Sequence, residues 1–512
     1  MKIIDCSFRD GGYFTNWDFE DNVVDAYIQA MNALPVDYVE LGYRNLPSKE
    51  YLGKFGYSPL SVLRKIHQMS SKKLGVMLNE KSTRLENLPK LLKPIIGLVD
   101  IIRIAVDPKN FDRAITLAIA VKNMGFKVGL NIMYMSKWKE DKNFIEKLNK
   151  LNDVVDIIYL VDSFGSIMPK EIRKIIREIK SSTTCAIGFH GHNNLQLGLI
   201  NTLTAIEEGC EFVDTTVLGM GRGAGNLNLE LLLTVLNKRN LNVDFNVLGE
   251  VVSVFQPLLN KYKWGTNLPY MLSGANSIPQ KEVMEWVCNR AYSFNSIVRA
   301  LDNKKKKLAD NAHFPIWKAT KSESVLIIGG GPSVIKHREA IREFLISNSD
   351  IVVIFATTRY AEYFSDLKNS KIYCLVGNEA KRMKRTVCST QFNGTVILPP
   401  YPRKMGTEVP EYVFSATYEL PTIDFTKVFI DSCTVTALSV AIEKKAQKTY
   451  IVGYDGYHGE ALSDKEIELS VENQTLFKAY KEYTNIPIVS LTPTLYSSLE
   501  KDSIYRMLIN IE

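Results

Sequence analysis

Two histidines stand one residue apart in the segment Phe189-His190-Gly191-His192-Asn193, and the chain has only six histidines in all. In a β-strand, residues two positions apart point to the same side, so His190 and His192 can bring two imidazoles to one place. Two imidazoles and one carboxylate form an open site for a divalent metal that also binds a substrate. A hydrogen-bonded pair with a structural role is the alternative for this motif taken alone.

An arginine and an aspartate adjoin in Ser7-Phe8-Arg9-Asp10-Gly11-Gly12, directly after a short apolar run. Asp10 can supply the carboxylate of such a metal site. An arginine beside it can stabilise a developing enolate oxygen or clamp a carboxylate. The alternative for Arg9 is an ion pair that closes the bottom of the fold, but its place after the run argues against that.

Eight short apolar runs recur at even spacing through the first part of the chain, and amphipathic helical patterns such as 22–34 and 111–124 lie between them. Continuous apolar strands that alternate with such helices are typical of a parallel sheet. Eight units predict a TIM (β/α)₈ barrel rather than an open doubly wound sheet. Reactive groups of such barrels lie at the carboxyl ends of the strands, and strands 7, 8 and 1 are neighbours, so Asp10 is within reach of both histidines. The runs are Ile3–Cys6, Tyr38–Leu41, Leu74–Leu78, Ile101–Val106, Val128–Met133, Ile157–Val161, Ala186–Phe189 and Phe212–Val217.

Residues 241–300 add helical patterns, Val247–Leu259 and Val283–Leu301, which we expect to pack onto the barrel. The lysine run at 304–307 is interpreted as a solvated connector rather than a patch that binds a partner. An apolar strand, a glycine turn and a helical pattern at 334–347 then begin a Rossmann-like α/β unit with room for five or six strands. We therefore predict a barrel domain at 1–302, a linker at 303–321 and a second domain at 322–512. Further strands are expected at Ile351–Ala356, Lys371–Val376, Thr395–Leu398 and Thr449–Val452.

Composition excludes several classes of protein. Hydrophobic residues make up 46% and charged residues 23%, which is typical of a folded globular chain. A net charge of +7 is mild for 512 residues; it does not predict nucleic-acid binding and suits an acidic substrate. Seven scattered cysteines without a C-x-x-C pair favour a reducing compartment over a disulfide scaffold. Because there is neither a signal-peptide pattern nor a long apolar run, we expect a cytoplasmic protein with no membrane span.

Three motifs together resemble the metal-dependent aldolase and lyase superfamily, the DRE-TIM metallolyases, over about residues 1–290. They are Asp5–Gly12, His190–Asn193 and the glycine loop Gly219–Asn226. The resemblance implies Mn²⁺ or Mg²⁺ held by Asp10, His190 and His192, with Asn226 as a further metal ligand. It also implies that Arg9 holds a 2-oxo acid and its enolate, while a carbon–carbon bond forms or breaks beside the carbonyl.

The aldolase branch, which includes 4-hydroxy-2-oxovalerate aldolase, is the most similar. Asp162-Ser163-Phe164-Gly165 and 264–269 resemble its members, which implies substrate contact at Ser163, a 2-oxo acid and an aldehyde as substrates, and a homodimer. These aldolases usually carry a histidine soon after Arg-Asp-Gly, but here Tyr13 follows. A phenol near a dication can have a lowered pKa, so Tyr13 is a candidate for proton transfer; a packed aromatic side chain is the alternative. The glycine loop lacks the cysteine of hydroxymethylglutaryl-CoA lyase, which argues against that lyase.

In the second unit, Gly329-Gly330-Gly331-Pro332-Ser333 joins a strand to a helix, where backbone N–H groups can hold phosphate. With 432–438 and 449–456, this turn resembles the Maf-type flagellin glycosylation proteins and the CMP-sialic-acid-using sialyltransferases. The resemblance implies a nucleotide or nucleotide-sugar site, with His458 as a candidate base. Binding or scaffolding without catalysis is the alternative. The residues near this site would be Gly330, Gly331, Ser333, Thr434 and Asp455.

Three functions remain open. The first is a divalent-metal aldolase that acts through the enolate of pyruvate or a related 2-oxo acid, with a role in surface polysaccharide biosynthesis suggested by the second unit. The second keeps the barrel but changes the reaction to a Claisen condensation with an acyl-CoA. The third is a nucleotide-sugar-binding protein or glycosyltransferase with a non-catalytic barrel.

Overall fold

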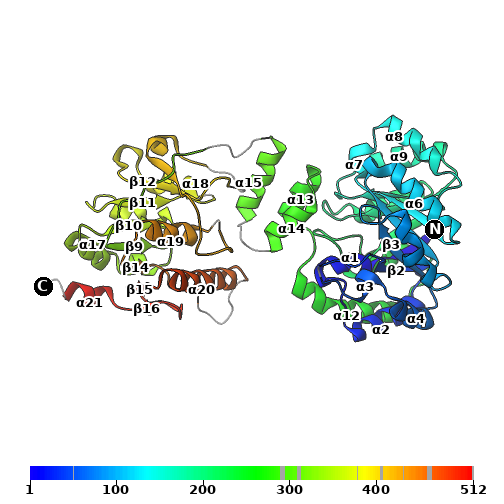
Figure 1. Ribbon diagram of the computed structural model, residues 1–512, viewed down its shortest axis with the longest axis horizontal. Coiled ribbons are helices and arrows are strands. Elements are labelled where there is room, and N and C mark those ends of the chain that lie inside the picture. Colours follow the sequence, from blue (N-terminus) through cyan, green and yellow to red (C-terminus); the bar gives the residue numbers. More distant parts are fainter. Residues whose placement is uncertain are drawn as a thin grey trace. The chain divides into compact units, whose positions relative to one another are not determined.

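The chain forms two compact units, Met1–Met284 and Glu285–Glu512 (Figure 1). The computed structural model describes residues 1–49, 51–288, 294–307, 313–377, 379–403, 408–430, 432–457 and 464–509. The division between the units falls before the linker expected at 303–321. Lys304 and Lys305 of the lysine run lie in the last turn of helix α15 (Phe294–Lys305).

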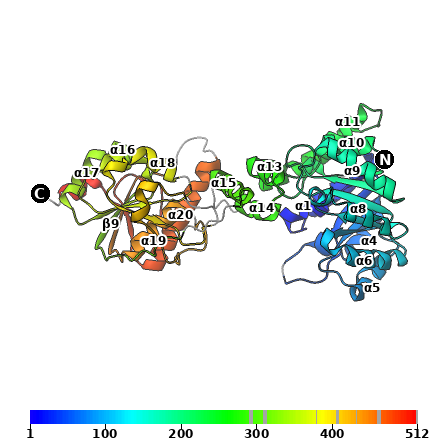
Figure 2. The same cartoon turned by 90° about the horizontal axis from the view of Figure 1, so that it is seen from above.

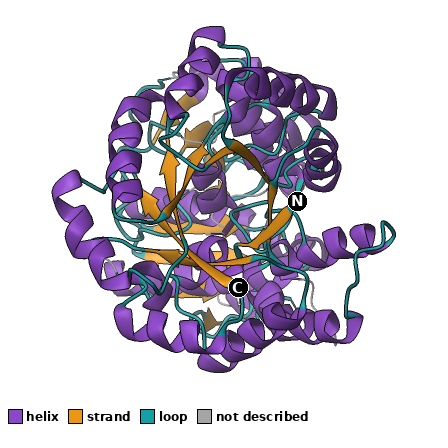
Figure 3. Ribbon diagram, turned by 90° about the vertical axis from the view of Figure 1, so that its right-hand side faces the viewer, coloured by secondary structure: helices purple, strands orange, loops and turns teal. Residues whose placement is uncertain are grey.

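The first unit is a closed barrel of eight parallel strands in sequence order, which confirms the TIM barrel. Strand β1 pairs with β2 on one side and with β8 on the other, and this second pairing closes the ring. Figure 3 shows the ring of strands with helices outside it. The strands are β1 (Lys2–Asp5), β2 (Tyr38–Tyr43), β3 (Lys73–Asn79), β4 (Ile101–Val106), β5 (Lys127–Ile132), β6 (Ile157–Asp162), β7 (Ala186–Gly191) and β8 (Phe212–Thr215).

Helices pack on the outside of the barrel through apolar stripes at helical spacing. In helix α9, for example, Ile172, Ile175, Ile176 and Ile179 are all buried, which is the face that a 3.6-residue period presents to the sheet. The helices of this part are α1 (Ser7–Thr15), α2 (Asp21–Ala33), α3 (Lys54–Tyr57), α4 (Leu60–Met69), α5 (Leu88–Leu92), α6 (Phe111–Asn123), α7 (Met135–Trp138), α8 (Lys142–Lys147), α9 (Pro169–Ser182), α10 (Gly198–Glu207), α11 (Leu229–Asn237), α12 (Phe245–Tyr262), α13 (Leu268–Ala275) and α14 (Gln280–Cys288).

Two helical segments differ from the sequence prediction. The residues after β1 form helix α1 directly, so Arg9 and Asp10 lie on a helix and not in a loop; the Asp10 N–H donates to the Cys6 carbonyl oxygen at 2.9 Å. The single helix expected at 283–301 is divided between α14 and α15, and residues 289–293 lie outside the described part. Within the residues that the structure describes, no helix has the length and apolar character to cross a membrane.

The second unit is a parallel sheet in the order β13-β12-β11-β10-β9-β14-β15-β16, consistent with a Rossmann-like domain. It has more strands than the five or six expected, because β13, β15 and β16 are short. The helix expected at 334–347 is interrupted at His337 and forms α16 and α17. The strands are β9 (Ser324–Ile328), β10 (Val352–Phe355), β11 (Lys371–Cys374), β12 (Thr395–Leu398), β13 (Thr417–Glu419), β14 (Lys448–Val452), β15 (Ile488–Ser490) and β16 (Glu500–Lys501).

Helices cover both faces of this sheet. Figure 2 shows α16, α17 and α18 on one side of β9, with α19 and α20 on the other. Two separate apolar clusters lie beneath them, one including Ile341 and Phe344, the other including Leu438 and Phe477. The chain leaves β9 toward β10 on one side and returns as β14 on the other, so the strand order reverses beside β9. The helices are α16 (Ser333–Lys336), α17 (Arg338–Ser347), α18 (Glu379–Thr386), α19 (Cys433–Glu443), α20 (Asp464–Thr484) and α21 (Ile504–Ile509).

Candidate active site

The two histidines and Asp10 meet at the carboxyl end of the barrel strands. His190 is the last residue but one of β7, and the ring centroids of His190 and His192 are 4.9 Å apart. Nε2 of His190 lies 3.6 Å from Oδ2 of Asp10, which α1 carries across from β1. The structure therefore brings together three side chains that are widely separated in the sequence; Asp10 and His192 are 182 positions apart.

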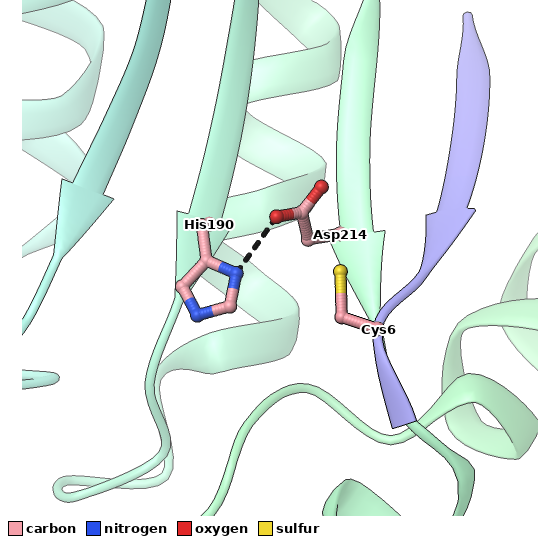
Figure 4. Close-up of side chains that lie close together, drawn as sticks. All are labelled: Cys6, His190 and Asp214. Carbon is pink, nitrogen blue, oxygen red and sulfur yellow. Dashed lines mark hydrogen bonds and ion pairs between the residues drawn. The ribbon is translucent and has the colours of Figure 1, made fainter. Parts of the chain in front are cut away.

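Both imidazoles are fixed through Nδ1. His190 donates from Nδ1 to Oδ2 of Asp214 at 2.8 Å, as Figure 4 shows, and His192 donates from Nδ1 to the backbone oxygen of Asp162 at 2.9 Å. Burial lowers the pKa of His192 to about 3, so its ring is neutral. Because Nδ1 of each ring is engaged within the chain, Nε2 is the nitrogen through which each ring can bind a metal.

Asp10 is ionised and surrounded by polar groups. Burial alone would raise its pKa, but the Arg9 guanidinium, with which it forms an ion pair, holds that pKa below its ordinary value. Asn226 donates from Nδ2 to Oδ2 of Asp10 at 2.6 Å. Oδ1 of Asn226 is buried and has no hydrogen-bond partner among the described residues. An amide oxygen left in this way, beside a carboxylate and two imidazoles, fits the donor set of a divalent cation.

A chain of buried charges links Arg9 to His190. Arg9 donates from Nε to Oε2 of Glu40 at 2.8 Å, and Nη1 of Arg103 lies 3.0 Å from the same oxygen. Arg103 also forms an ion pair with Asp214, the carboxylate that holds His190. Although burial would raise it, Arg103 keeps the pKa of Asp214 at about 2. Arg9, Glu40, Arg103 and Asp214 therefore each have an opposite charge beside them, as buried ions require.

Sequence reasoning missed Glu40, Arg103 and Asp214. Each stands inside an otherwise apolar strand, in Tyr38–Tyr43, Ile101–Val106 and Phe212–Thr215. A charged residue within a buried strand has to be paired, so these interruptions were a usable signal.

Cys6, His190 and Asp214 form a second group with metal-ligand chemistry, and their donor atoms all lie within 4.8 Å of one another (Figure 4). Burial raises the pKa of the Cys6 thiol well above its ordinary value, so the sulfur keeps its proton. Asp214 is already engaged by both His190 and Arg103. Since a thiolate and not a thiol binds metals, this trio is less suited to an ion than the set around Asp10.

The other residues expected in the barrel site have internal partners. The Tyr13 hydroxyl lies 2.9 Å from the Tyr43 hydroxyl, and the Tyr13 ring packs edge-on against Trp17. Tyr13 is therefore both a packed aromatic and a member of a hydroxyl pair. Oγ of Ser163 accepts the backbone N–H of Tyr134 at 2.8 Å, so this hydroxyl helps to fix the turn after β5.

In the second unit, the glycine turn meets the end of β14. The Gly331 N–H donates to the Gly453 oxygen at 2.8 Å, and the Ser333 N–H donates to Oδ2 of Asp455 at 2.9 Å. These donors are therefore engaged within the chain, and a carboxylate occupies the place beside them. The Gly330 oxygen accepts a hydrogen bond from Nη1 of Arg359 at 3.1 Å.

Thr434 is held apart from this turn by its own partners. It donates from Oγ1 to Oδ1 of Asn473 at 2.9 Å, and the Tyr454 hydroxyl lies 3.4 Å away. Gly331, Ser333 and Asp455 thus lie together at the end of β14, whereas Thr434 contacts other residues. His458, the candidate base, lies outside the described residues.

Known proteins resemble the barrel half of the chain. The HMGL-like family matches residues 103–254. The 4-hydroxy-2-oxovalerate aldolase of Geobacillus thermodenitrificans is 30% identical over 251 residues, which is 47% of this chain and 70% of that protein. The oxaloacetate decarboxylase of Mycobacterium tuberculosis is 26% identical over 240 residues, or 46% of this chain and 70% of the relative.

A solved structure extends the similarity. The N-terminal domain of a candidate aldolase from Bacteroides vulgatus is 63% identical, covers 59% of this chain and all (100%) of that domain, and superposes with a TM-score of 0.56. These matches agree with the closed barrel and with the motifs at the ends of its strands. Through its N-terminal barrel, the chain belongs to the HMGL-like family of the DRE-TIM superfamily.

Proposed function

We propose that the barrel is a divalent-metal-dependent carbon–carbon lyase that acts through the enolate of pyruvate or a related 2-oxo acid. One observation carries the proposal: Nδ1 of His190 and Nδ1 of His192 are both engaged by the chain, which leaves both Nε2 atoms available beside the ionised Asp10. The names of the two relatives, an aldolase and a decarboxylase of 2-oxo acids, support this class of reaction.

Asp10, His190 and His192 would hold the metal, with Asn226 as a fourth ligand through its unpartnered Oδ1. Carboxylate, imidazole and amide oxygen suit Mn²⁺ or Mg²⁺. A bound dication would draw electrons from the 2-oxo group and so favour loss of a proton or a carbon substituent from the adjacent carbon.

Arg9 would stabilise the negative charge that develops on the substrate. Its Nε and one Nη1 hydrogen are engaged by Glu40 and Asp10, and a guanidinium has five N–H donors, so donors remain for a carboxylate or an enolate oxygen. Because Glu40 and Asp10 fix the guanidinium before substrate arrives, no reorganisation is needed as the charge forms.

Tyr13 and Tyr43 would move the proton that a histidine moves in most pyruvate aldolases. Their hydroxyl oxygens are 2.9 Å apart, so a proton given up by one can be replaced from the other. Ser163 would donate its own O–H to the substrate, since its oxygen accepts the Tyr134 N–H and the hydroxyl proton remains available.

Decarboxylation of oxaloacetate is a second candidate for the same site. It passes through the same enolate, and one relative is named for it. It also requires no base for a substrate hydroxyl, which suits a barrel that has Tyr13 in place of a histidine.

An assay of pyruvate release, coupled to lactate dehydrogenase, tests the two reactions with 4-hydroxy-2-oxovalerate and with oxaloacetate. Aldol cleavage that falls in Tyr13→Phe but not in Tyr51→Phe, a change of an exposed tyrosine, supports the aldolase. Decarboxylation that is equal in both variants supports the second candidate. The proposal fails if the metal-loaded protein forms pyruvate from neither compound.

For the second unit we propose a nucleotide or nucleotide-sugar ligand. We also propose that the two units act together in surface polysaccharide biosynthesis and that the protein is a homodimer. In open α/β sheets, ligands bind beyond the carboxyl ends of the strands where the strand order reverses. That point lies beside β9 and β14, where Gly330, Gly331, Ser333 and Asp455 stand. Calorimetric titration of the full chain with CMP and CDP tests it: the Asp455→Asn variant should bind differently from the wild type.

A further inference from the structure

Arg222 lies at the mouth of the barrel, and its side chain forms no ion pair with the described residues of the first unit. It follows β8 in the glycine loop, and its guanidinium carbon lies 3.9 Å from the centroid of the Tyr13 ring. Across residues 1–49 and 51–288, the Arg222 guanidinium makes no hydrogen bond or ion pair with any described side chain or backbone group; only its backbone oxygen is engaged, by the Gly225 N–H at 3.1 Å. Arg9 and Arg103, by contrast, each pair with two carboxylates.

The surroundings of Arg222 place it beside the proposed reaction centre. The groups whose charges act on it are those of Tyr13, Tyr43, Asp10 and Tyr134, and the residue is partly buried. Tyr134 stands after β5 with Lys137, whose Nζ is 5.4 Å from the Tyr134 ring centroid. Arg222 therefore lies near Asp10 and near Tyr134, the residue that follows β5.

The stacked geometry leaves the binding edge of the guanidinium available. Contact with the Tyr13 ring occupies one flat face, whereas the N–H donors lie in the plane and point outward. A partly desolvated cation without a partner is unfavourable, and a bound anion would remove that cost by pairing with it. A planar fork of donors matches a carboxylate or a phosphate.

We propose that Arg222 binds the anionic group, carboxylate or phosphate, of the second substrate, the compound whose carbonyl carbon is joined to or released from the enolate. This inference rests on the proposed function, because Arg9 is assigned there to the 2-oxo acid. An acceptor anchored on Arg222 lies over Tyr13, so its carbonyl oxygen is directed toward the Tyr13–Tyr43 hydroxyl pair.

Binding of non-reacting anions tests Arg222 without any turnover. Metal-free wild type, Arg222→Met and Arg222→Lys are titrated calorimetrically with succinate and with inorganic phosphate. Arg239→Met, which removes an exposed arginine of the same unit, is the matched control. We expect one anion to bind the wild type and to bind Arg222→Met roughly 10- to 150-fold more weakly, the range for a hydrogen bond to a charged group. Arg222→Lys keeps part of the affinity.

The anion whose affinity falls in Arg222→Met shows whether the anionic group of the acceptor is a carboxylate or a phosphate. Equal affinity in wild type and Arg222→Met, or no binding of either anion to the wild type, overturns the proposal. Arg222→Lys keeps the test valid if Arg222→Met folds poorly.

Turnover then separates this proposal from the one on which it rests. With pyruvate as donor, the acceptors propanal, succinic semialdehyde and glyceraldehyde 3-phosphate are compared by kcat/KM. In Arg222→Met, we expect kcat/KM to fall by the same factor for one anionic aldehyde and to stay unchanged for propanal. If no aldehyde reacts in the wild type, the proposed lyase activity fails, whereas the anion titration still decides the role of Arg222.

Discussion

Asp214 accepts the Nδ1 proton of His190 at 2.8 Å and at the same time pairs with Arg103 behind it. The imidazole is therefore turned so that Nε2 faces Asp10, which lies 3.6 Å away. A partner of this kind orients a metal ligand and raises its basicity, and its loss typically reduces metal affinity by about 10- to 100-fold.

Replacement of Asp214 by asparagine should weaken Mn²⁺ binding by about 10- to 100-fold while leaving the fold intact, because the amide oxygen still accepts the proton but lacks the charge. Electron paramagnetic resonance of free Mn²⁺ measures this affinity. Asp112→Asn, on an aspartate whose side chain is 80% exposed, should bind Mn²⁺ as the wild type does. Unchanged affinity in Asp214→Asn would show that the carboxylate does not act through His190.

Removal of the buried Arg103 guanidinium should destabilise the barrel. Arg103→Met leaves Glu40 and Asp214 without their shared cation, and breaking a buried ion pair in this way costs about 3–5 kcal/mol. Urea unfolding followed by circular dichroism measures the free energy of unfolding. Arg239→Met, at a side chain that is 49% exposed, should change that free energy by less than about 0.5 kcal/mol. A loss below about 1 kcal/mol in Arg103→Met would contradict the account of the interior charges.

Two substitutions distinguish the alternative metal sites. Cys6→Ser should leave Mn²⁺ affinity nearly unchanged, because burial raises the pKa of the Cys6 thiol and the sulfur is not a thiolate. His192→Gln should abolish binding at micromolar metal. Titration of both variants with Mn²⁺ gives the answer. The reverse pattern, loss in Cys6→Ser and retention in His192→Gln, would assign the ion to the Cys6, His190 and Asp214 group.

Asp5 gives a pH dependence of stability with a defined sign. Burial raises the pKa of Asp5 to about 6, so the folded barrel holds this proton more tightly than the unfolded chain does. Stability from this group is therefore present below about pH 4 and is lost as pH rises to about 6, by up to about 3 kcal/mol. Asp5→Asn cannot lose a proton, so its free energy of unfolding relative to wild type should increase between pH 4 and pH 7. A difference that is constant over that range, measured by urea unfolding, would contradict the assignment.

The barrel could be predicted from the sequence because its strands are buried on both faces and appear as apolar runs. The ends of β4, for example, coincide with the run Ile101–Val106. Helix α1 could not be predicted, since Gly11 and Gly12 are poor helix formers and the segment has no clear apolar period. The glycines are needed because a side chain at Gly12 would overlap the Trp17 ring, and one at Gly11 would overlap Met220.

The candidate site was only partly visible in the sequence. His190, His192 and Asp10 could be found from their types and places at strand ends. Their orientation depends on Asp214 and on the Asp162 carbonyl oxygen, which are far away along the chain or carry no side-chain signal. The role of Arg222 could not be predicted either, because only the fold shows which arginines have carboxylates beside them.

Exchange of the methyl protons of pyruvate in D₂O, followed by NMR with Mg²⁺ or trace Mn²⁺, tests the enolate chemistry most directly, since it requires no knowledge of the second substrate. The account predicts exchange in the wild type that disappears with EDTA, in His190→Ala and in Arg9→Ala, and persists in Arg239→Met. An absence of exchange in wild type with the metal shown to be bound, or exchange that survives EDTA and both active-site substitutions, would contradict it.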